Sequence, residues 1–314
     1  GCAVVTTEFE NVPAGALDHL AARTLVRPGS ASVRVCQDRI EEKRFLQGLG
    51  IAVAPFAVVV DDGPVADDLC PGILKSARFG YDGHGQVPVE RPSDLAAARA
   101  VLDGAPAVLE RRMALDLELS VVLTRGADGE VRCFPPAENR HVGGILDTSL
   151  VPASAGRPLL DEAVEVATTI SAELDHVGTL GVEFFVCDGR LLVNELAPRT
   201  HNSGHYTLDA CAPDQFEQHL RAVCGVPLAE VRTRGAAVMV NLLGDRWFDD
   251  GRPREPDWGA VLAVPDLHLH LYGKVEARPG RKMGHLTVVA DELEVATAGA
   301  EAARAALARP VAPS

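Results

Sequence analysis

Hydrophobic and polar positions alternate along the chain in short blocks, and the first blocks predict a strand followed by two helices. The β-branched run at residues 2–7 is typical of a strand, and leucine, alanine and histidine at helical spacing over residues 15–23 predict the first helix. Asp38 as an N-cap and Gly50 as a stop enclose the apolar positions of the second helix.

The middle of the chain favours strands over helices. Apolar runs predict strands at residues 73–75, 86–90, 107–110, 118–124 and 131–134. The glycine-containing segment 126–129 is expected to join the last two strands as a hairpin. Ser93 is expected to cap an alanine-rich helix that follows the second strand. This order predicts a small α+β unit.

The third quarter of the chain predicts two helices around a hairpin. An amphipathic helix is expected over residues 161–176, with Gly178 as its end, and Asp188-Gly189 is the expected turn of a hairpin over residues 180–196. The helix predicted over residues 214–223 is expected to place Phe216, Leu220 and Val223 on one face.

The last quarter predicts a β-rich unit closed by a helix. Residues 236–243 form an apolar run, residues 267–271 alternate leucine with histidine, and residues 298–308 are rich in alanine.

Composition and charge narrow the possible functions. The 314 residues are 47% hydrophobic, without a signal peptide pattern or the run of about 20 apolar residues that spans a membrane, so a cytoplasmic protein of two or three domains is expected. A net charge of −14 argues against binding to nucleic acid. The seven cysteines are odd in number and lack a C-x-x-C pair, which predicts reduced, mostly buried thiols and argues against zinc.

A lysine and a glycine-rich loop form the first candidate site. Lys75 ends an apolar strand, and the backbone N–H groups of the loop at residues 80–86 could close on a polyphosphate while the lysine supplies charge. No helix follows the glycines, so the segment is neither a Walker loop nor a Rossmann fingerprint. Taken alone, the loop is explained better as a flexible hairpin.

Two carboxylates on the predicted hairpin form the second candidate site. An odd-length turn would place Glu183 opposite Glu195, whereas a two-residue turn would place it opposite Asn194, so the register decides whether this is a site. Opposed carboxylates repel each other unless a cation lies between them, and Mg²⁺ prefers oxygen ligands. Two solvated carboxylates explain the pair equally well in isolation.

Two further segments carry clustered cations and hydrogen-bonding groups. The loop at residues 197–206 follows the hairpin directly and could bind a small oxyanion beside a metal. Residues 272–274 and 278–285 form a basic island in an acidic chain, which fits a phosphate monoester. A solvated basic turn is the simpler explanation of that island alone.

In this order, the motifs resemble the carboxyaminoimidazole ribonucleotide synthase branch of the ATP-grasp superfamily, from about Val5 to Leu286. Residues 194–199 are shared loosely by relatives of this branch, whereas residues 201–205 and 278–285 are more specific to it. The resemblance implies an α+β ATP-grasp fold, with two subdomains that clasp ATP. It divides the chain into a remnant of an N-terminal pre-ATP-grasp domain, the ATP-grasp domain with its lid, and a β-rich C-terminal domain, at residues 1–34, 35–228 (lid about 53–113) and 229–314.

The resemblance also implies an activity. It is the ATP-dependent joining of bicarbonate to 5-aminoimidazole ribonucleotide, through carboxyphosphate, in de novo purine biosynthesis. ATP and Mg²⁺ would be required, and the protein would be a homodimer. Within the lid subdomain, the glycine hinges of the loop at residues 80–86 make this loop the candidate for the part that closes over the site.

Site residues follow from the same resemblance. Those implied around ATP are Arg39, Lys75, Gly80, Tyr81, Asp82, Gly83, His84, Gly85, Gln86, Glu110 (adenine hinge), Arg111, Arg112, Met113, Glu118 (ribose), His141, Asn194 and Glu195. Glu183 and Glu195 would hold the metal, while Arg199, His201 and Asn202 would bind bicarbonate and act in catalysis with Asp82, which would handle a proton. The residues implied around the ribonucleotide are Glu8, Tyr81, Asp82, Arg199, Lys274, Arg281 and Lys282.

One departure from the family pattern leaves alternatives open. Members of the family begin with a strand and a turn of the type G-G-G-Q-L-G, and nothing of this kind precedes residues 3–5. About half of the N-terminal domain is therefore expected to be absent. There are two competing hypotheses. The protein could be another ATP-grasp ligase, or it could be a module that binds ATP without turning it over.

Overall fold

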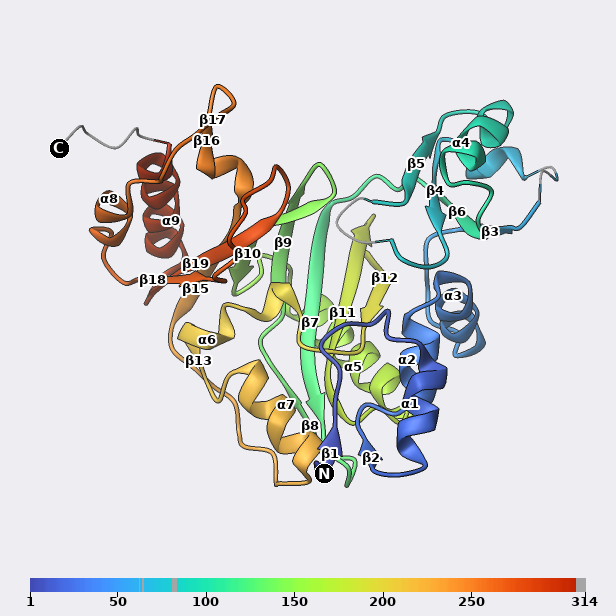
Figure 1. Cartoon of the computed structure of the whole chain (residues 1–314), viewed down its shortest axis with the longest axis horizontal. Coiled ribbons are helices and arrows are strands. Elements are labelled where there is room, and N and C mark those ends of the chain that lie inside the picture. The colour runs from blue at the N-terminus through green and yellow to red at the C-terminus, as the bar shows by residue number, and fades with distance from the viewer. Residues whose placement is uncertain (62, 64, 81–83, 309–314) are drawn as a thin grey trace.

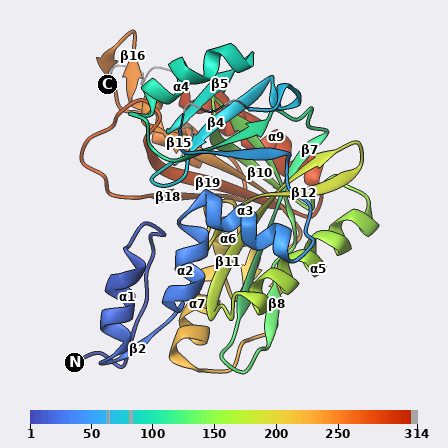
Figure 2. The ribbon, with the colours of Figure 1, turned by 90° about the vertical axis from the view of Figure 1, so that its right-hand side faces the viewer.

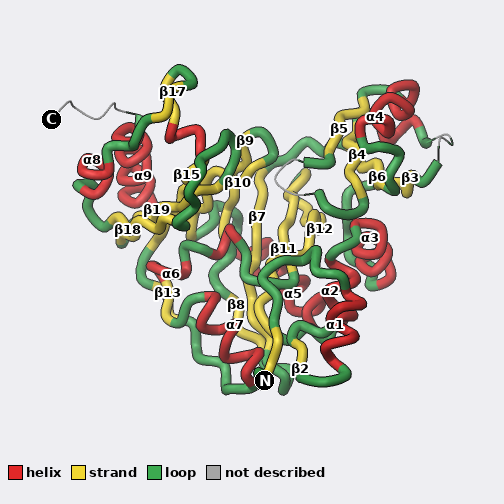
Figure 3. The backbone as a smooth tube through the Cα atoms, viewed as in Figure 1, coloured by secondary structure: helices red, strands yellow, loops and turns green. Residues whose placement is uncertain are grey.

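The computed structural model describes residues 1–61, 63, 65–80 and 84–308, and within them two larger β-sheets organise the chain (Figure 1). One sheet has nine strands and the other has four. Figure 3 shows the helices packed around the large sheet and beside the small one. None of the helices in the described part of the chain is long and apolar enough to cross a membrane.

The N-terminal segment pairs two short strands and stacks three helices beside them. Its elements are β1 (Val4–Val5), α1 (Ala14–Ala21), β2 (Leu25–Val26), α2 (Ser30–Cys36) and α3 (Arg39–Gly48), and β1 pairs with β2 in parallel. The Asp38 carboxylate accepts hydrogen bonds from the N–H groups of Ile40 and Glu41, which confirms the predicted N-cap. Helix α2 was not predicted, because seven residues are too few to show a helical period.

The small sheet is antiparallel and carries α4 (Leu95–Val101) against its apolar face. Its strand order is β3 (Phe56–Val59), β6 (Ala107–Arg111), β4 (Gly72–Ser76) and β5 (Gln86–Val89). The prediction that Ser93 caps the helix is wrong. Ser93 lies inside the 3₁₀ turn Pro92–Asp94, which starts a turn early because proline fixes a helical φ.

The large sheet is antiparallel throughout and runs from the hairpin to the C-terminal strands. Its order is β12 (Arg190–Ala197), β11 (Gly178–Cys187), β7 (Leu117–Arg125), β9 (Ala137–Val142), β10 (Ile145–Val151), β15 (Ala236–Leu243), β19 (Lys282–Ala290) and β18 (Leu267–Leu271), with β8 (Val131–Cys133) paired to β7. The β7–β8 and β11–β12 hairpins confirm the predictions. Because β10 pairs with β15, the sheet is continuous across the domain boundary predicted at residue 228.

Helices cover both faces of this sheet (Figure 2). Helix α5 (Arg157–Glu173) packs on one face and α7 (Gln215–Cys224) on the other, while α9 (Leu293–Leu307) packs on β15 and β19 and carries α8 (Trp258–Leu262). Helix α5 starts four residues before the predicted position, since Pro158 favours a helix start, and Gly178 opens β11 instead of ending the helix. The remaining elements are short: α6 (Thr207–Ala210), β13 (Cys211–Ala212), β14 (Arg232–Thr233), β16 (Phe248–Asp249), β17 (Arg252–Pro253) and the 3₁₀ turns Asp67–Leu69, Asn202–Gly204 and Gly244–Trp247.

Helix α7 faces the sheet with polar residues, contrary to the prediction. Phe216 and Leu220 are 37% and 59% exposed, although Val223 is buried as expected. Gln215 and His219 are buried instead, and each makes hydrogen bonds to the backbone of a neighbouring segment. Satisfying buried polar groups therefore outweighs the amphipathic pattern in this helix.

All seven cysteines are free thiols in the structure. Cys36, Cys187 and Cys211 are buried, whereas Cys2 and Cys224 are exposed, so the prediction of mostly buried thiols is confirmed only in part.

Candidate active site

A cavity of about 680 Å³ opens between the two sheets, and Tyr272, Lys274 and Lys282 of the basic island form part of its wall. It has the size expected of a small-molecule site. The predicted site residues that line it are Glu8, Arg39, Lys75, Gln86, Glu118, His141, Glu183, Asn194, Glu195, Arg199, His201, Asn202, Lys274 and Lys282. Segments that lie far apart in the sequence therefore contribute to one space.

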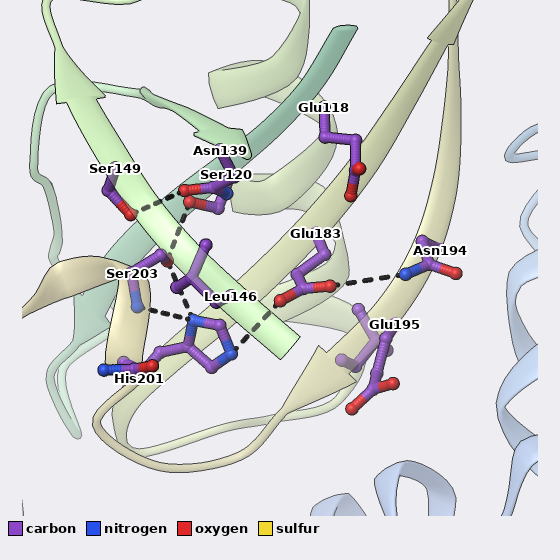
Figure 4. Close-up of polar contacts among 12 residues, drawn as sticks. Glu118, Ser120, Asn139, Leu146, Ser149, Glu183, Asn194, Glu195, His201 and Ser203 are labelled. Carbon is purple, nitrogen blue, oxygen red and sulfur yellow. Dashed lines mark hydrogen bonds and ion pairs between the residues drawn. The ribbon is translucent and has the colours of Figure 1, made fainter. Parts of the chain in front are cut away.

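A β-bulge decides the register of the two carboxylates. The hairpin turn has two residues, Asp188 and Gly189, both with positive φ as a type I′ turn requires. That turn alone would place Glu183 opposite Asn194. The strands shift by one residue between Phe184 and Glu183, so that Glu183 pairs with Glu195 and Asn194 is the extra residue of the bulge. Glu183 accepts a hydrogen bond of 3.3 Å from the side-chain amide of Asn194, and Figure 4 shows all three side chains together.

The two opposed carboxylates are in different electrostatic states. Burial alone would raise the pKa of Glu195, but the Arg39 guanidinium, 2.9 Å away, holds the pKa below its usual value. Burial and the negative charge of Glu195 raise the pKa of Glu183. The negative charge of Glu195 is therefore balanced by Arg39, whereas the positive charge near Glu183 is too small to balance that carboxylate.

Lys75 projects from the small sheet towards the same carboxylates. Its Nζ lies 2.9 Å from Oε2 of Glu110 and 3.5 Å from the side-chain oxygen of Asn194. Burial lowers the pKa of Lys75, and burial would raise that of Glu110, but Lys75 and Lys43 hold the Glu110 pKa at about 2. The Glu110 side chain faces these lysines and does not line the cavity. If Glu110 contacts the adenine of ATP, it would therefore do so through its backbone.

A second acid–base pair lies on the neighbouring strands of the large sheet. Nδ1 of His141 on β9 is 2.7 Å from Oε2 of Glu118 on β7. Burial lowers the pKa of His141, but the contacts with Glu118 and Glu183 outweigh burial and raise it. The pair can therefore offer both a donor and an acceptor to a ligand.

The His201 loop is fixed from both sides. The side-chain amide of Gln215 accepts from the His201 N–H at 2.8 Å and donates to the His201 carbonyl at 2.9 Å. On the sheet side, Gly181 leaves the space that the imidazole occupies, since a Cβ there would lie 2.8 Å from the ring. The loop position therefore depends on one residue of α7 and one glycine of β11.

The protonation of His201 follows from its partners. Burial lowers its pKa well below the ordinary value, with Arg199 and Lys282 adding to the effect, so the ring is neutral. The N–H of Ser203 donates to Nδ1 at 3.3 Å, which leaves the ring proton on Nε2. Nε2 lies 3.4 Å from Glu183 Oε1, so the loop and the metal-binding candidates are in contact (Figure 4).

Two further groups of the loop lie beside His201. Asn202 exchanges two hydrogen bonds with Asn241 of β15, at 3.0 and 2.7 Å, which fixes its amide. The Arg199 side chain hydrogen-bonds to the carboxylate of Glu10 and to the carbonyl of Thr200. The three side chains implied for bicarbonate therefore lie together in the cavity wall.

Several predicted residues lie elsewhere. Arg111 and Arg112 form surface ion pairs with Asp68 and Glu90, at 2.7 and 2.9 Å. Others also contribute nothing to the cavity wall: Gly80, His84, Gly85, Glu110, Met113 and Arg281. Tyr81, Asp82 and Gly83 lie outside the described residues, so their implied roles stay predictions.

The cavity also contains residues that the sequence did not predict as site residues. They are Phe9, Glu10, Ile73, Leu115, Gly144, Leu146, Phe185, Thr200, His205, Phe216 and Tyr272. Most are apolar or carry no motif, and they become site residues only through the fold. Thr200, His205 and Tyr272 stood inside the two motifs and could have been included on that basis.

Among the described residues, two groups have donors that suit a metal ion. Glu183 and Glu195, with the Asn194 amide, offer oxygen ligands beside a lysine and so fit Mg²⁺ with a bound phosphate. The second group has three residues whose ligand atoms, one from each residue, all lie within 4.8 Å of one another: Asp209, His270 and His285. In that second group His270 already hydrogen-bonds both Asp209 oxygens, at 3.0 and 3.1 Å, and its ring stacks on His285. The carboxylate pair is therefore the better candidate.

Comparisons with known protein families match most of the chain. The model of the ATP-grasp domain matches residues 44–216, and that of the phosphoribosylaminoimidazole carboxylase C-terminal domain matches residues 237–298.

Curated relatives are similar over nearly all of this chain. Over 291 residues the chain is 46% identical to the N5-carboxyaminoimidazole ribonucleotide synthase of Brucella melitensis, covering 90% of this chain and 78% of that protein. Over 289 residues it is 41% identical to the Bacillus subtilis protein of the same name, covering 90% and 74%.

Solved structures agree with the sequence matches. The Thermus thermophilus N5-carboxyaminoimidazole ribonucleotide synthetase superposes with a TM-score of 0.87 at 40% identity, covering all of this chain and 84% of that one. The Aspergillus clavatus enzyme in complex with ADP and 5-aminoimidazole ribonucleotide gives a TM-score of 0.87 at 30% identity, covering 98% and 82%.

Proposed function

The chain belongs to the ATP-grasp family of N5-carboxyaminoimidazole ribonucleotide synthases, and from this membership we propose how its residues divide the work of the reaction. It is an ATP-dependent ligase that carboxylates 5-aminoimidazole ribonucleotide to N5-carboxyaminoimidazole ribonucleotide in purine biosynthesis. The observation that carries the residue assignment is the bulge in β12, which pairs Glu183 with Glu195 in a cavity that Lys75 also lines.

We assign the triphosphate of ATP to the space between the two sheets. Lys75 and Gln86 would approach it from the small sheet, and Asn194 from β12. Glu118 would bind the ribose, with His141 as its partner. In this assignment residues 35–228 form the ATP-grasp domain, with residues of about 53–113 as its lid, between the N-terminal residues 1–34 and a C-terminal domain of residues 229–314.

Glu183 and Glu195 would hold Mg²⁺, which supplies positive charge to the phosphates during phosphoryl transfer. The unbalanced charge of Glu183 and the proximity of Lys75 support this assignment. Arg39, which neutralises Glu195 in the structure, would then be available to the phosphates.

We assign bicarbonate to Arg199, His201 and Asn202. The neutral His201 keeps its proton on Nε2 and can donate it to an oxyanion, while Arg199 supplies the charge. A bicarbonate oxygen would attack the γ-phosphorus of ATP, forming one P–O bond and breaking the bond to ADP. The product of this step is carboxyphosphate.

The second step transfers the carboxyl group to the ribonucleotide. Carboxyphosphate would release carbon dioxide and phosphate, and the exocyclic amine would form a bond to the carbon and lose a proton. Glu8, Lys274 and Lys282 line the part of the cavity assigned to the ribonucleotide. Arg281, which the resemblance also implies for this substrate, donates to the Glu276 carbonyl instead of lining the cavity. Exclusion of water is required here, because carboxyphosphate hydrolyses. Tyr81 and Asp82, the latter proposed to take the proton, lie in the undescribed segment.

Phosphate release with ATP, bicarbonate and 5-aminoimidazole ribonucleotide, each omitted in turn, tests this function. We expect fast release only with the complete mixture and Mg²⁺. Phosphate release that does not depend on the ribonucleotide would indicate another ATP-grasp ligase, or hydrolysis of ATP without ligation. No release with any mixture would indicate a module that only binds ATP.

The metal requirement is expected to depend on pH. Since the pKa of Glu183 is raised, a proton competes with the metal at a pH where an ordinary glutamate is fully ionised. The Mg²⁺ concentration for half-maximal rate should therefore increase as the pH is lowered, and the increase should begin above the pH at which an ordinary glutamate takes up a proton. Titrations of Mg²⁺ at a series of pH values measure this increase, with the exposed Glu41→Gln variant as a control that keeps the trend. A constant Mg²⁺ requirement would contradict the assignment of Glu183.

We also propose that the chain acts as a homodimer, as the family resemblance implies. Light scattering of the protein as it elutes from a size-exclusion column gives its mass in solution. The mass of a monomer at micromolar concentration would contradict the proposed dimer.

A further inference from the structure

One face of α3 contacts three consecutive residues of β12. Glu42 and Lys43 follow Arg39 by three and four residues, so their side chains share a helix face, and all three are buried. Arg39 holds the Glu195 carboxylate, as described above. The other two contacts, made by Glu42 and Lys43, are to the backbone at the bulge and have no part in the mechanism proposed above.

Glu42 and Lys43 pair with polar backbone groups on either side of Glu195. Nζ of Lys43 donates to the carbonyl of Asn194 at 3.1 Å, and Oε2 of Glu42 accepts from the N–H of Leu196 at 2.9 Å. Strand β12 lies at the edge of the large sheet, and in the described part of the chain its outer side pairs with Val53 only at Val193, before these groups. Polar side chains of a helix therefore complete the hydrogen bonding that a neighbouring strand would otherwise supply.

The bulge makes these contacts important for the carboxylate pair. An extra residue at Asn194 interrupts the regular ladder with β11, so pairing with that strand does not by itself fix the backbone there. One residue before the bulge, the N–H of Val193 donates to the carbonyl of Ala52 at 2.8 Å. From Asn194 onwards, the outer side of the strand is held by α3.

Lys43 also connects the bulge to the small sheet. Its Nζ lies 3.6 Å from Oε1 of Glu110, whose other oxygen binds Lys75 at 2.9 Å. Lys43 itself is 0% exposed. With Arg39, Glu42 and Glu195 the cluster brings together three basic and three acidic side chains, of which Glu110 and Glu195 form ion pairs. Burial raises the pKa of Glu42 to about 8, so this carboxyl group can keep a proton at neutral pH and still accept the hydrogen bond from Leu196.

We propose that Lys43, with Glu42, is a positioning residue for the reaction. It touches neither substrate nor metal, and it holds the Asn194–Glu195 bulge and the Lys75–Glu110 pair in the arrangement that binds the metal and the triphosphate. This inference rests on the proposed function of Glu195 and Lys75.

Lys43→Met in the full chain tests the proposal, because methionine fills the space but donates no hydrogen bond. Supporting partners of metal ligands affect metal affinity or activity by about 10- to 100-fold, so we expect kcat to fall, and the Mg²⁺ requirement to rise, by about 10-fold. The KM for the ribonucleotide should stay within about 2-fold, since the side chain of Lys43 contacts Asn194 and Glu110, which are not assigned to that substrate. A residue needed only for folding would lower the amount of active protein without changing the Mg²⁺ requirement.

Three matched variants complete the test. Arg44→Met, on the exposed side of α3, should behave as the unaltered chain. Glu42→Gln keeps an acceptor for the Leu196 N–H and should retain most activity, whereas Glu42→Leu should resemble Lys43→Met. If Lys43→Met does not fold, Glu42→Leu carries the same expectation. An unchanged Mg²⁺ requirement in the folded variants overturns this inference, while loss of ribonucleotide-dependent turnover in the unaltered chain overturns the proposed function instead.

Discussion

Glu195→Gln is expected to lower kcat by roughly 100-fold, because the amide cannot replace an ionised ligand where several kcal/mol of charge stabilisation are needed. Glutamine has the same shape as glutamate and keeps the bulge. The variant should therefore lose turnover far more than stability. Steady-state phosphate release at saturating ATP, bicarbonate and ribonucleotide measures the effect.

The control for this variant is Glu41→Gln, which removes an exposed carboxylate of α3. Thermal unfolding of both proteins shows whether the fold survives. Loss of the Arg39 ion pair affects stability in Glu195→Gln, so the comparison uses kcat of folded protein. A Glu195→Gln enzyme with unchanged kcat would remove Glu195 from the metal site.

Lys282→Ala is expected to raise the KM for 5-aminoimidazole ribonucleotide by about 10- to 100-fold, since a hydrogen bond to a charged group contributes about 1.5–3 kcal/mol. Lys282 lines the cavity together with Lys274, whose Nζ donates to the Lys282 carbonyl. The KM for ATP should change little, because the triphosphate is assigned to Lys75, Gln86 and Asn194. Initial rates with each substrate varied in turn separate the two constants.

Arg278→Ala is the matched control for this prediction. Arg278 belongs to the same basic island, but it pairs with Glu276 at 2.5 Å on the exposed surface and does not line the cavity. Removing it should leave both KM values unchanged. Equal ribonucleotide affinity in Lys282→Ala and the unaltered chain would contradict the phosphate assignment.

The local signals in the sequence predicted the elements better than their partners. Asp188-Gly189 fixed the hairpin turn, and Asp38 fixed the start of α3, because both act through neighbouring backbone groups. Strands β9 and β10 were missed, since charged residues such as Arg140 interrupt their apolar pattern. The polar face of α7 was missed for a similar reason, because its partners lie in distant loops.

In the candidate site, too, the sequence predicted local features better than contacts between distant segments. The motifs identified most of the polar cavity residues, whereas the register that pairs Glu183 with Glu195 was left open by the turn. The bulge that settles it is held by Glu42 and Lys43, about 150 residues earlier in the chain. No local pattern contains that information. The partner of Lys75 was also unpredictable, since Glu110 lies on a strand that the fold brings beside it.

Binding of Mn²⁺ in the presence of ADP, followed by its electron paramagnetic resonance signal, tests the carboxylate pair most directly. The unaltered chain is expected to bind one ion whose affinity increases when ADP is present, and both Glu183→Gln and Glu195→Gln should lose that binding. Full ADP-dependent binding in both variants would contradict the assignment of the metal to the β11–β12 hairpin.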